Sequence, residues 1–128
     1  MTNARKSRGM ATQRLLQSWF RRRGHPFATA TGAGESGVDL RHMLGLSPEV
    51  KATSKGDLLA ALRQATANRG KGLPFVIWRP NGYGPERIGQ WVVAFTLEDA
   101  SKLLADAGYG DPYDKWGLHD PNWTDHEE

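Results

Sequence analysis

Apolar residues recur along the chain with two different spacings, and each spacing predicts one type of secondary structure. From Met10 to Arg23 they return every three or four residues with arginines between them, which predicts an amphipathic helix that ends at Gly24. Further along, Leu73–Trp78 is a continuous apolar run, as is typical of a strand buried at the centre of a sheet. The chain therefore combines helices and strands.

Shorter patterns predict the elements between these two. Three short strands are expected after the first helix, over Phe27–Thr31, Val38–Met43 and Leu46–Ala52. Ser54 and Asp57 have the spacing of a capping box, so a second helix is expected to follow and to end near Gly70. Its predicted apolar face consists of Leu58, Leu59, Leu62 and Ala65.

The last third of the chain repeats this alternation. Trp91–Phe95 predicts a strand, and Thr96 with Asp99 predicts the capped start of a helix that Gly108 ends. The order α-β-β-β-α-β-β-α predicts an α/β fold with a mixed sheet flanked by helices. We expect a basic, flexible N-terminus over 1–9, one domain over 10–110 and an acidic C-terminal tail over 111–128.

Composition excludes several classes of protein. The 128 residues include no cysteine, so disulfides, a thiol nucleophile and a thiolate zinc site are absent. Apolar runs are too short to cross a bilayer and no signal peptide is recognisable, so we expect a protein of the cytoplasm with no membrane partner. The four histidines lack zinc-ligand spacing. No phosphate-binding G-x-x-x-x-G-K-[ST] loop is present, so no nucleotide cofactor is expected.

Charge is distributed unevenly along the chain. Residues 98–128 carry nine acids against two lysines, a net charge of −7, so residues 1–97 carry +10. A basic body is typical of a protein that binds a phosphate backbone, although a solvated basic surface with an acidic solubilising tail would have the same composition. The candidate DNA contacts are Arg5, Lys6, Arg8, Arg14, Arg21, Arg22, Arg23, Thr31, Gly32 and Lys55.

The most informative motif is an aspartate followed ten residues later by a Glu-x-Lys triplet. Because side chains alternate along a strand, Glu49 and Lys51 point to the same side and Val50 points into the core. Asp39, from the neighbouring strand or turn, can then lie beside Glu49. A surface salt bridge between Glu49 and Lys51 is the simpler interpretation of the triplet alone.

Two carboxylates and one ammonium suit phosphodiester hydrolysis. Mg²⁺ prefers oxygen ligands and keeps several waters, so Asp39 and Glu49 could hold it, with the Val50 carbonyl as a further ligand. Mn²⁺ is a possible substitute. Lys51 would orient the attacking water or stabilise the negative charge of the transition state.

This pattern resembles the PD-(D/E)xK nuclease superfamily, and within it the Holliday junction resolvases of the archaeal type and their bacteriophage relatives. The resemblance covers about residues 5–107. It rests on Arg5-Lys6-Ser7-Arg8-Gly9, the first helix, Gly32-Ala33-Gly34, Gly37-Val38-Asp39 and Pro48-Glu49-Val50-Lys51-Ala52-Thr53-Ser54. It implies a restriction-endonuclease-like core, metal binding by Asp39 and Glu49, and Lys51 as the catalytic lysine.

The chain departs from the family pattern at two positions. Val38 precedes Asp39 where the family name has proline. The family often has a glutamate on the first helix, four residues after a glycine, and counting from Gly9 gives Gln13. Gln13 can hydrogen-bond a metal-bound water but brings no charge. Gln64 on the second helix lies where many superfamily nucleases place a polar residue facing the site, and solvent exposure is the simpler interpretation of both glutamines.

These observations lead to one expected function and two alternatives. We expect a Mg²⁺-dependent endonuclease that cleaves branched double-stranded DNA as a homodimer in a bacterial or phage-infected cytoplasm. The protein could instead cut flaps or forks, or act as a phage or restriction-type nuclease. It could also be an inactive nuclease fold that only binds DNA.

Overall fold

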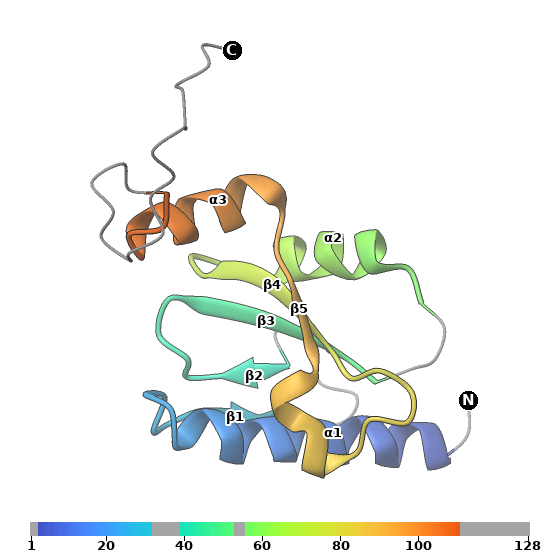
Figure 1. Cartoon of the computed structure of the whole chain (residues 1–128). Helices are drawn as coiled ribbons and strands as arrows, with labels where there is room; N and C mark the ends of the chain where they lie inside the picture. The colour runs from blue at the N-terminus through green and yellow to red at the C-terminus, as the bar shows by residue number, and fades with distance from the viewer. Residues whose placement is uncertain (1–2, 32–38, 53–55, 111–128) are drawn as a thin grey trace. The chain divides into compact units, whose positions relative to one another are not determined.

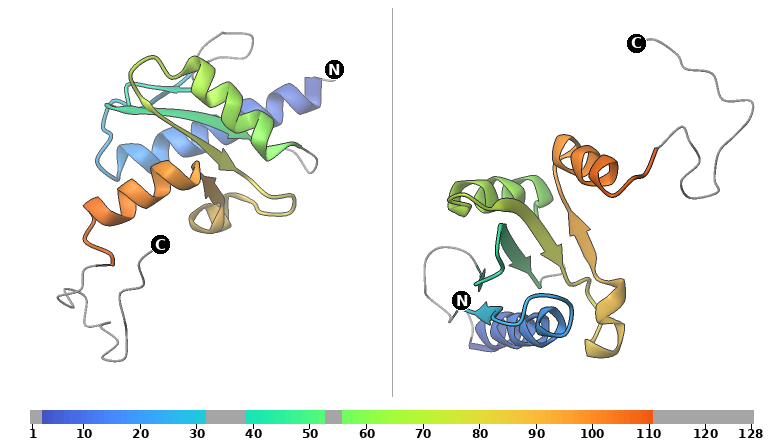
Figure 2. Two further views of the ribbon diagram at one scale, coloured as in Figure 1. Left: turned by 90° about the horizontal axis from the view of Figure 1, so that it is seen from above. Right: turned by 90° about the vertical axis from the view of Figure 1, so that its left-hand side faces the viewer.

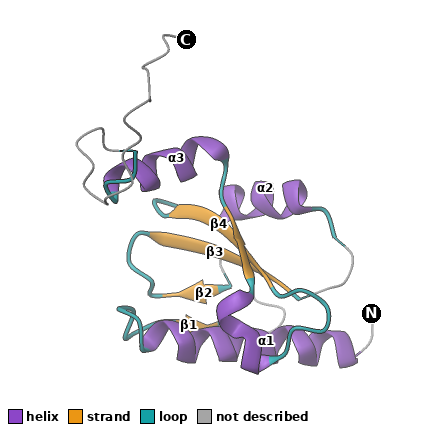
Figure 3. Ribbon diagram, in the orientation of Figure 1, coloured by secondary structure: helices purple, strands orange, loops and turns teal. Residues whose placement is uncertain are grey.

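The structure is a computed structural model that describes residues 3–31, 39–52 and 56–110 (Figure 1). The chain divides into two compact units, Met1–Phe95 and Thr96–Glu128. The order of helices and strands agrees with the predicted α-β-β-β-α-β-β-α order, with a short 3₁₀ helix, η1 (Pro85–Gln90), between the last two strands (Figure 3).

The first helix, α1 (Asn3–Arg21), begins seven residues earlier than predicted and ends two residues earlier. Its first turns lack apolar periodicity, but Ala4, Arg5 and Lys6 have high helix propensity, which explains the longer helix. Gly24 follows with a φ of 95°, a left-handed conformation that glycine adopts at little cost and that turns the chain away from the helix.

The strands form two small sheets. In the first, β1 (Thr29–Ala30) pairs antiparallel with β2 (Leu40–Arg41). In the second, β4 (Leu73–Trp78) lies between β3 (Leu46–Lys51), to which it is parallel, and β5 (Val92–Ala94), to which it is antiparallel. The central position predicted for Leu73–Trp78 is thus confirmed with the same boundaries.

The two helices of the first unit, α1 and α2 (Leu58–Asn68), cover opposite faces of the three-stranded sheet (Figure 2). On the α1 side the hydrophobic core gathers Leu16, Leu40, Phe75 and Ile77, with Val50 packed against it, as predicted for that side chain. Alternation along the strands places Glu49 and Lys51 on the opposite side. Strand β3 therefore contributes to the core with one face and carries the candidate site on the other.

The orientation predicted for α2 is wrong in part. Its buried residues are Ala61 and Ala65, whereas Leu58 and Leu59 are exposed. Two alanines one turn apart let the helix backbone lie close to the sheet, which is not possible where leucines face it. The helix is capped by Asp57, whose carboxylate accepts a hydrogen bond from the Ala60 N–H at 3.2 Å. Ser54, the predicted cap, lies outside the described residues.

The second unit contains α3 (Leu97–Asp106). The predicted Thr96 cap is confirmed, since its hydroxyl accepts a hydrogen bond from the Asp99 N–H at 3.2 Å. The tail over 111–128 lies outside the described residues. None of the helices in the described ranges is long and apolar enough to cross a membrane.

Candidate functional site

The backbone of Asp39 is fixed on both sides, immediately before β2. Its N–H donates to the Pro48 carbonyl at 3.3 Å, and its carbonyl accepts hydrogen bonds from the Thr31 N–H at 3.0 Å and the Thr31 hydroxyl at 3.2 Å. The Asp39 carboxylate in turn accepts a hydrogen bond from the Val50 N–H at 2.6 Å. Asp39 therefore contacts the residues before and after Glu49, and its charge acts on the Glu49 carboxyl group.

Glu49 and Lys51 form an ion pair on the α2 side of β3. Lys51 Nζ lies 3.3 Å from Glu49 Oε2, and the two side chains are 33% and 5% exposed, respectively. This is the salt bridge that the simpler interpretation of the triplet anticipated. It is not a surface pair, however, because Glu49 is buried and adjoins a second carboxylate, that of Asp39.

Both carboxyl groups of this site are harder to ionise than usual. Burial raises the pKa of Asp39, against the lowering effects of the Val50 hydrogen bond and of Lys51. Burial also raises the pKa of Glu49, and the charge of Asp39 raises it further, while Lys51 lowers it. One ammonium group therefore does not compensate the buried Glu49 carboxylate and the half-buried Asp39 carboxylate, and an additional cation would stabilise their ionised forms.

The two carboxylates suit a hard divalent cation, because they are oxygen ligands whose negative charge Lys51 compensates only in part. Within the described residues no cluster of three or more His, Cys, Asp or Glu side chains is placed to hold a metal. An ion at Asp39 and Glu49 would therefore take two protein carboxylates and complete its shell largely with water, as Mg²⁺ often does. The Val50 carbonyl, predicted as a further ligand, belongs to the same strand segment.

The two predicted glutamines occupy different surroundings. Gln64 is exposed on α2 and lines a pocket together with Lys51. Gln13 lies on α1 one turn before Gln17, whose Oε1 accepts a hydrogen bond from the Ala30 N–H at 2.8 Å. Because residues four apart share a helix face, Gln13 lies on the side of α1 that meets β1. Its Oε1 is buried and has no hydrogen-bond partner among the described residues.

A pair of arginines lies near the carboxyl ends of β3 and β4. The Arg79 N–H donates to the Lys51 carbonyl at 2.8 Å, and its guanidinium donates to the Thr12 hydroxyl at 2.8 Å and the Tyr83 carbonyl at 2.9 Å. Burial lowers the pKa of Arg79, and the charge of Arg8 lowers it further, against the opposing effect of Glu86. The charge of Arg8 thus acts on Arg79, which lies at the same end of the sheet as Lys51.

The other predicted DNA contacts are distributed along α1 and two loops. Arg14 and Arg22 are exposed, whereas Arg21 donates to the Ala28 carbonyl at 2.8 Å and Arg23 stacks on Trp19, 3.3 Å from the ring centroid. Arg21–Arg23 lie about 20 Å along the helix from Arg8, given its rise of about 1.5 Å per residue. Thr31 is buried. The described structure does not include Gly32, Lys55 or the side chains of Arg5 and Lys6.

Sequence reasoning did not find Arg79 or Trp78. Trp78 is the last residue of β4 and is the register partner of Lys51 in the parallel pair. The position of Trp78 and Arg79 at the end of a predicted strand was a usable signal. The carboxyl ends of neighbouring parallel strands meet at one edge of a sheet, where ligands bind in many α/β folds. Which residues become neighbours depends on the register, which the apolar run of β4 does not encode.

Comparisons of the chain with models of known protein families, with curated proteins and with solved structures found no match.

Proposed function

We propose that this protein is a Mg²⁺-dependent endonuclease that cleaves branched DNA, in the manner of a Holliday junction resolvase. The observation that carries the proposal is the convergence of the buried Glu49 carboxylate, the half-buried Asp39 carboxylate and a lysine at the end of β3, with pKa values of Asp39 and Glu49 raised by burial and, for Glu49, by its neighbour. The basic charge of residues 1–97 supports a polyanionic substrate.

Each side chain of the site has a role in this reaction. Asp39 and Glu49 would hold the metal, and the hydrogen bond from the Val50 N–H fixes the Asp39 carboxylate. When bound, Mg²⁺ supplies charge neutralisation at the scissile phosphate and a more acidic attacking water. Lys51, held by Glu49, donates hydrogen bonds to the phosphate oxygens as negative charge develops on them.

A homodimer in the cytoplasm would suit this substrate. A four-way junction has two-fold symmetry, and its resolution needs two cuts, so a C₂ dimer would present one site to each strand. Phe27 and Leu44 are 74% and 97% exposed and line a pocket of about 570 Å³ with His42 and Met43. Apolar side chains exposed to this degree are typical of an interaction surface, and we propose that the second copy docks there.

Cleavage of a labelled four-way junction in Mg²⁺ tests the proposal. The wild type is expected to cut, whereas Glu49→Gln and Lys51→Ala are expected to lose at least 100-fold in rate, in line with the loss of one electrostatic group from an active site. The matched controls are Glu98→Gln and Lys102→Ala, because these residues form an exposed ion pair at 3.9 Å in α3. Equal cleavage by Glu49→Gln and the wild type would overturn the proposal.

One observation favours a second candidate, a nuclease-like fold that binds DNA without cutting it. The position where the related nucleases often have a glutamate is Gln13, which brings no charge to the site. For this candidate, DNA binding persists in EDTA and no cleavage occurs in Mg²⁺ or Mn²⁺. Metal-dependent strand scission that Lys51→Ala abolishes would exclude it.

A further inference from the structure

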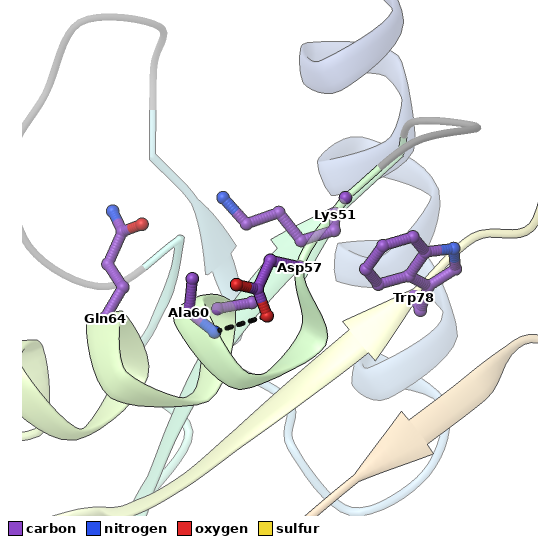
Figure 4. Close-up of a pocket in the computed structure, with 7 residues that line it drawn as sticks. Lys51, Asp57, Ala60, Gln64 and Trp78 are labelled. Carbon is purple, nitrogen blue, oxygen red and sulfur yellow. Dashed lines mark hydrogen bonds between the residues drawn. The ribbon is translucent and has the colours of Figure 1, made fainter.

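A pocket of about 230 Å³ opens beside the Lys51 side chain, between the ends of β3 and β4 and the first turns of α2 (Figure 4). Trp78 stands at one end of this pocket and Gln64 at the other, with Asp57 between them (Figure 4). Its size suits a single planar ring system, since it is smaller than the roughly 300–1,000 Å³ of sites that enclose larger ligands.

The indole of Trp78 lies close against Gly56, in space that a side chain at that position would occupy. A Cβ atom at Gly56 would lie 2.5 Å from the Cη2 atom of Trp78, closer than real contacts allow. The parallel register of β3 and β4 places Trp78 directly beside Lys51 on the same face of the sheet. The aromatic wall and the ammonium group therefore belong to one recognition surface.

The polar groups of the pocket select the kind of ligand. The Asp57 carboxylate disfavours a phosphate inside the pocket, but it can accept a hydrogen bond from an amino group. One of its oxygens already accepts the Ala60 N–H at 3.2 Å, and a carboxylate has further lone pairs available. Gln64 offers both an amide donor and an amide acceptor, which suits the mixed edge of a heterocycle. An aromatic wall provides a stacking surface for such a ring.

We infer that this pocket binds one unpaired nucleobase of the DNA, stacked on Trp78, while the adjoining phosphate lies at Lys51. The inference deepens the proposed function, on which it rests, by specifying a substrate with an unpaired nucleotide beside the cleaved bond. Lys51 links the two sites, because it lines the pocket and also pairs with Glu49 at 3.3 Å. The pocket accepts one base and not a base pair, so it favours branch points and single-stranded ends over intact duplex.

Binding measured in EDTA tests the pocket independently of cleavage. The probes are two short duplexes that carry one unpaired nucleotide, either 2-aminopurine or an abasic residue. The full-length wild type is expected to bind the base-containing probe about 5- to 150-fold more tightly, the range that stacking of one base on an aromatic side chain provides. The 2-aminopurine fluorescence should be quenched on binding.

Three variants assign the effect to the pocket. Trp78→Leu is expected to abolish both the preference for the base-containing probe and the fluorescence quenching, while leaving affinity for the abasic probe unchanged. Trp78→Phe should retain most of the preference and most of the quenching. Gly56→Ala, which displaces the indole, should also weaken the preference. Trp19→Leu is the matched control, because Trp19 lies on α1 under Arg23 and does not line the pocket.

The outcomes separate this inference from the proposed function. An equal ratio of the two affinities in the wild type and Trp78→Leu, with both proteins folded by circular dichroism, overturns the base pocket even if junction cleavage is observed. Base-dependent binding that Trp78→Leu abolishes supports the pocket even if the protein does not cut DNA in Mg²⁺. Loss of affinity for both probes to the same extent in Trp78→Leu also overturns it, because the tryptophan would then act without regard to the base.

Discussion

The carboxylate pair makes a prediction about stability that needs no DNA. In the metal-free protein, the raised pKa values of Asp39 and Glu49 mean that ionising these groups opposes folding. Replacing Glu49 by the isosteric glutamine removes the charge of the more deeply buried of the two groups. We therefore expect Glu49→Gln to melt at a higher temperature than the wild type in EDTA at pH 8, above the usual range of both groups.

A divalent cation should reverse this order. An ion that binds only the folded state stabilises it by about 1.4 kcal/mol when its concentration is tenfold above the dissociation constant. The site lies in the unit Met1–Phe95, and for a domain of this size each kcal/mol corresponds to about 4–8 °C. Mg²⁺ is therefore expected to raise the melting temperature of the wild type by about 6–11 °C and that of Glu49→Gln by far less.

Thermal unfolding followed by circular dichroism, in EDTA and over a Mg²⁺ titration, measures both effects. Glu98→Gln is the control, since the Glu98 side chain is 79% exposed and pairs only loosely with Lys102, at 3.9 Å. It should respond to Mg²⁺ as the wild type does. An equal Mg²⁺ response in Glu49→Gln, or a lower melting temperature of this variant in EDTA, would refute the reasoning that the pair is a charge-strained metal site.

Three further predictions concern pH, the core and the dimer. In EDTA, the double variant Asp39→Asn/Glu49→Gln should gain stability relative to the wild type as pH rises from the ordinary pKa values of 3.8 and 4.5 through the raised ones, because the wild type then loses the protons that its folded state prefers to keep. Urea unfolding at several pH values measures the difference in unfolding free energy, and a difference that does not change with pH would contradict the prediction. Leu40→Ala should cost about 2–5 kcal/mol in urea unfolding, because Leu40 is 0% exposed in the core, and a loss below 1 kcal/mol would contradict its placement. Leu44→Lys should convert the proposed dimer to a monomer in sedimentation velocity. Because Leu44 is 97% exposed, the same change should alter the unfolding free energy of the monomer by less than about 0.5 kcal/mol. A sedimentation coefficient equal to that of the wild type would contradict a dimer contact at Leu44.

The elements that were predicted well are those whose local pattern has one physical solution. The run Leu73–Trp78 is bounded by residues that do not continue it, so both ends of β4 were predicted correctly. The pattern of α2 was ambiguous, because leucines and alanines both recur at helical spacing. Ala61 and Ala65 are the buried residues because α2 packs close to the sheet, and how closely it packs is a property of the tertiary structure.

In the candidate site, too, the residues set by a local pattern were predicted and those set by the tertiary structure were not. The alternation of a strand was enough to place Glu49 and Lys51 on one face, and the short loop between β2 and β3 was enough to bring Asp39 near them. Trp78 and Arg79 were not predicted, because their proximity to Lys51 depends on how β4 aligns with β3. A shift of one residue in that alignment would have placed a different side chain beside the lysine.

The contacts of Asp39 also close a sheet edge. Among the described strands, β3 pairs with β4 alone, and along its other side the Asp39 carboxylate accepts a hydrogen bond from the Val50 N–H while the Asp39 N–H donates to the Pro48 carbonyl. Free N–H and C=O groups on an outer strand invite pairing with another chain. The aspartate proposed to bind metal thus also occupies two backbone groups of this edge with which a strand of another chain could otherwise pair.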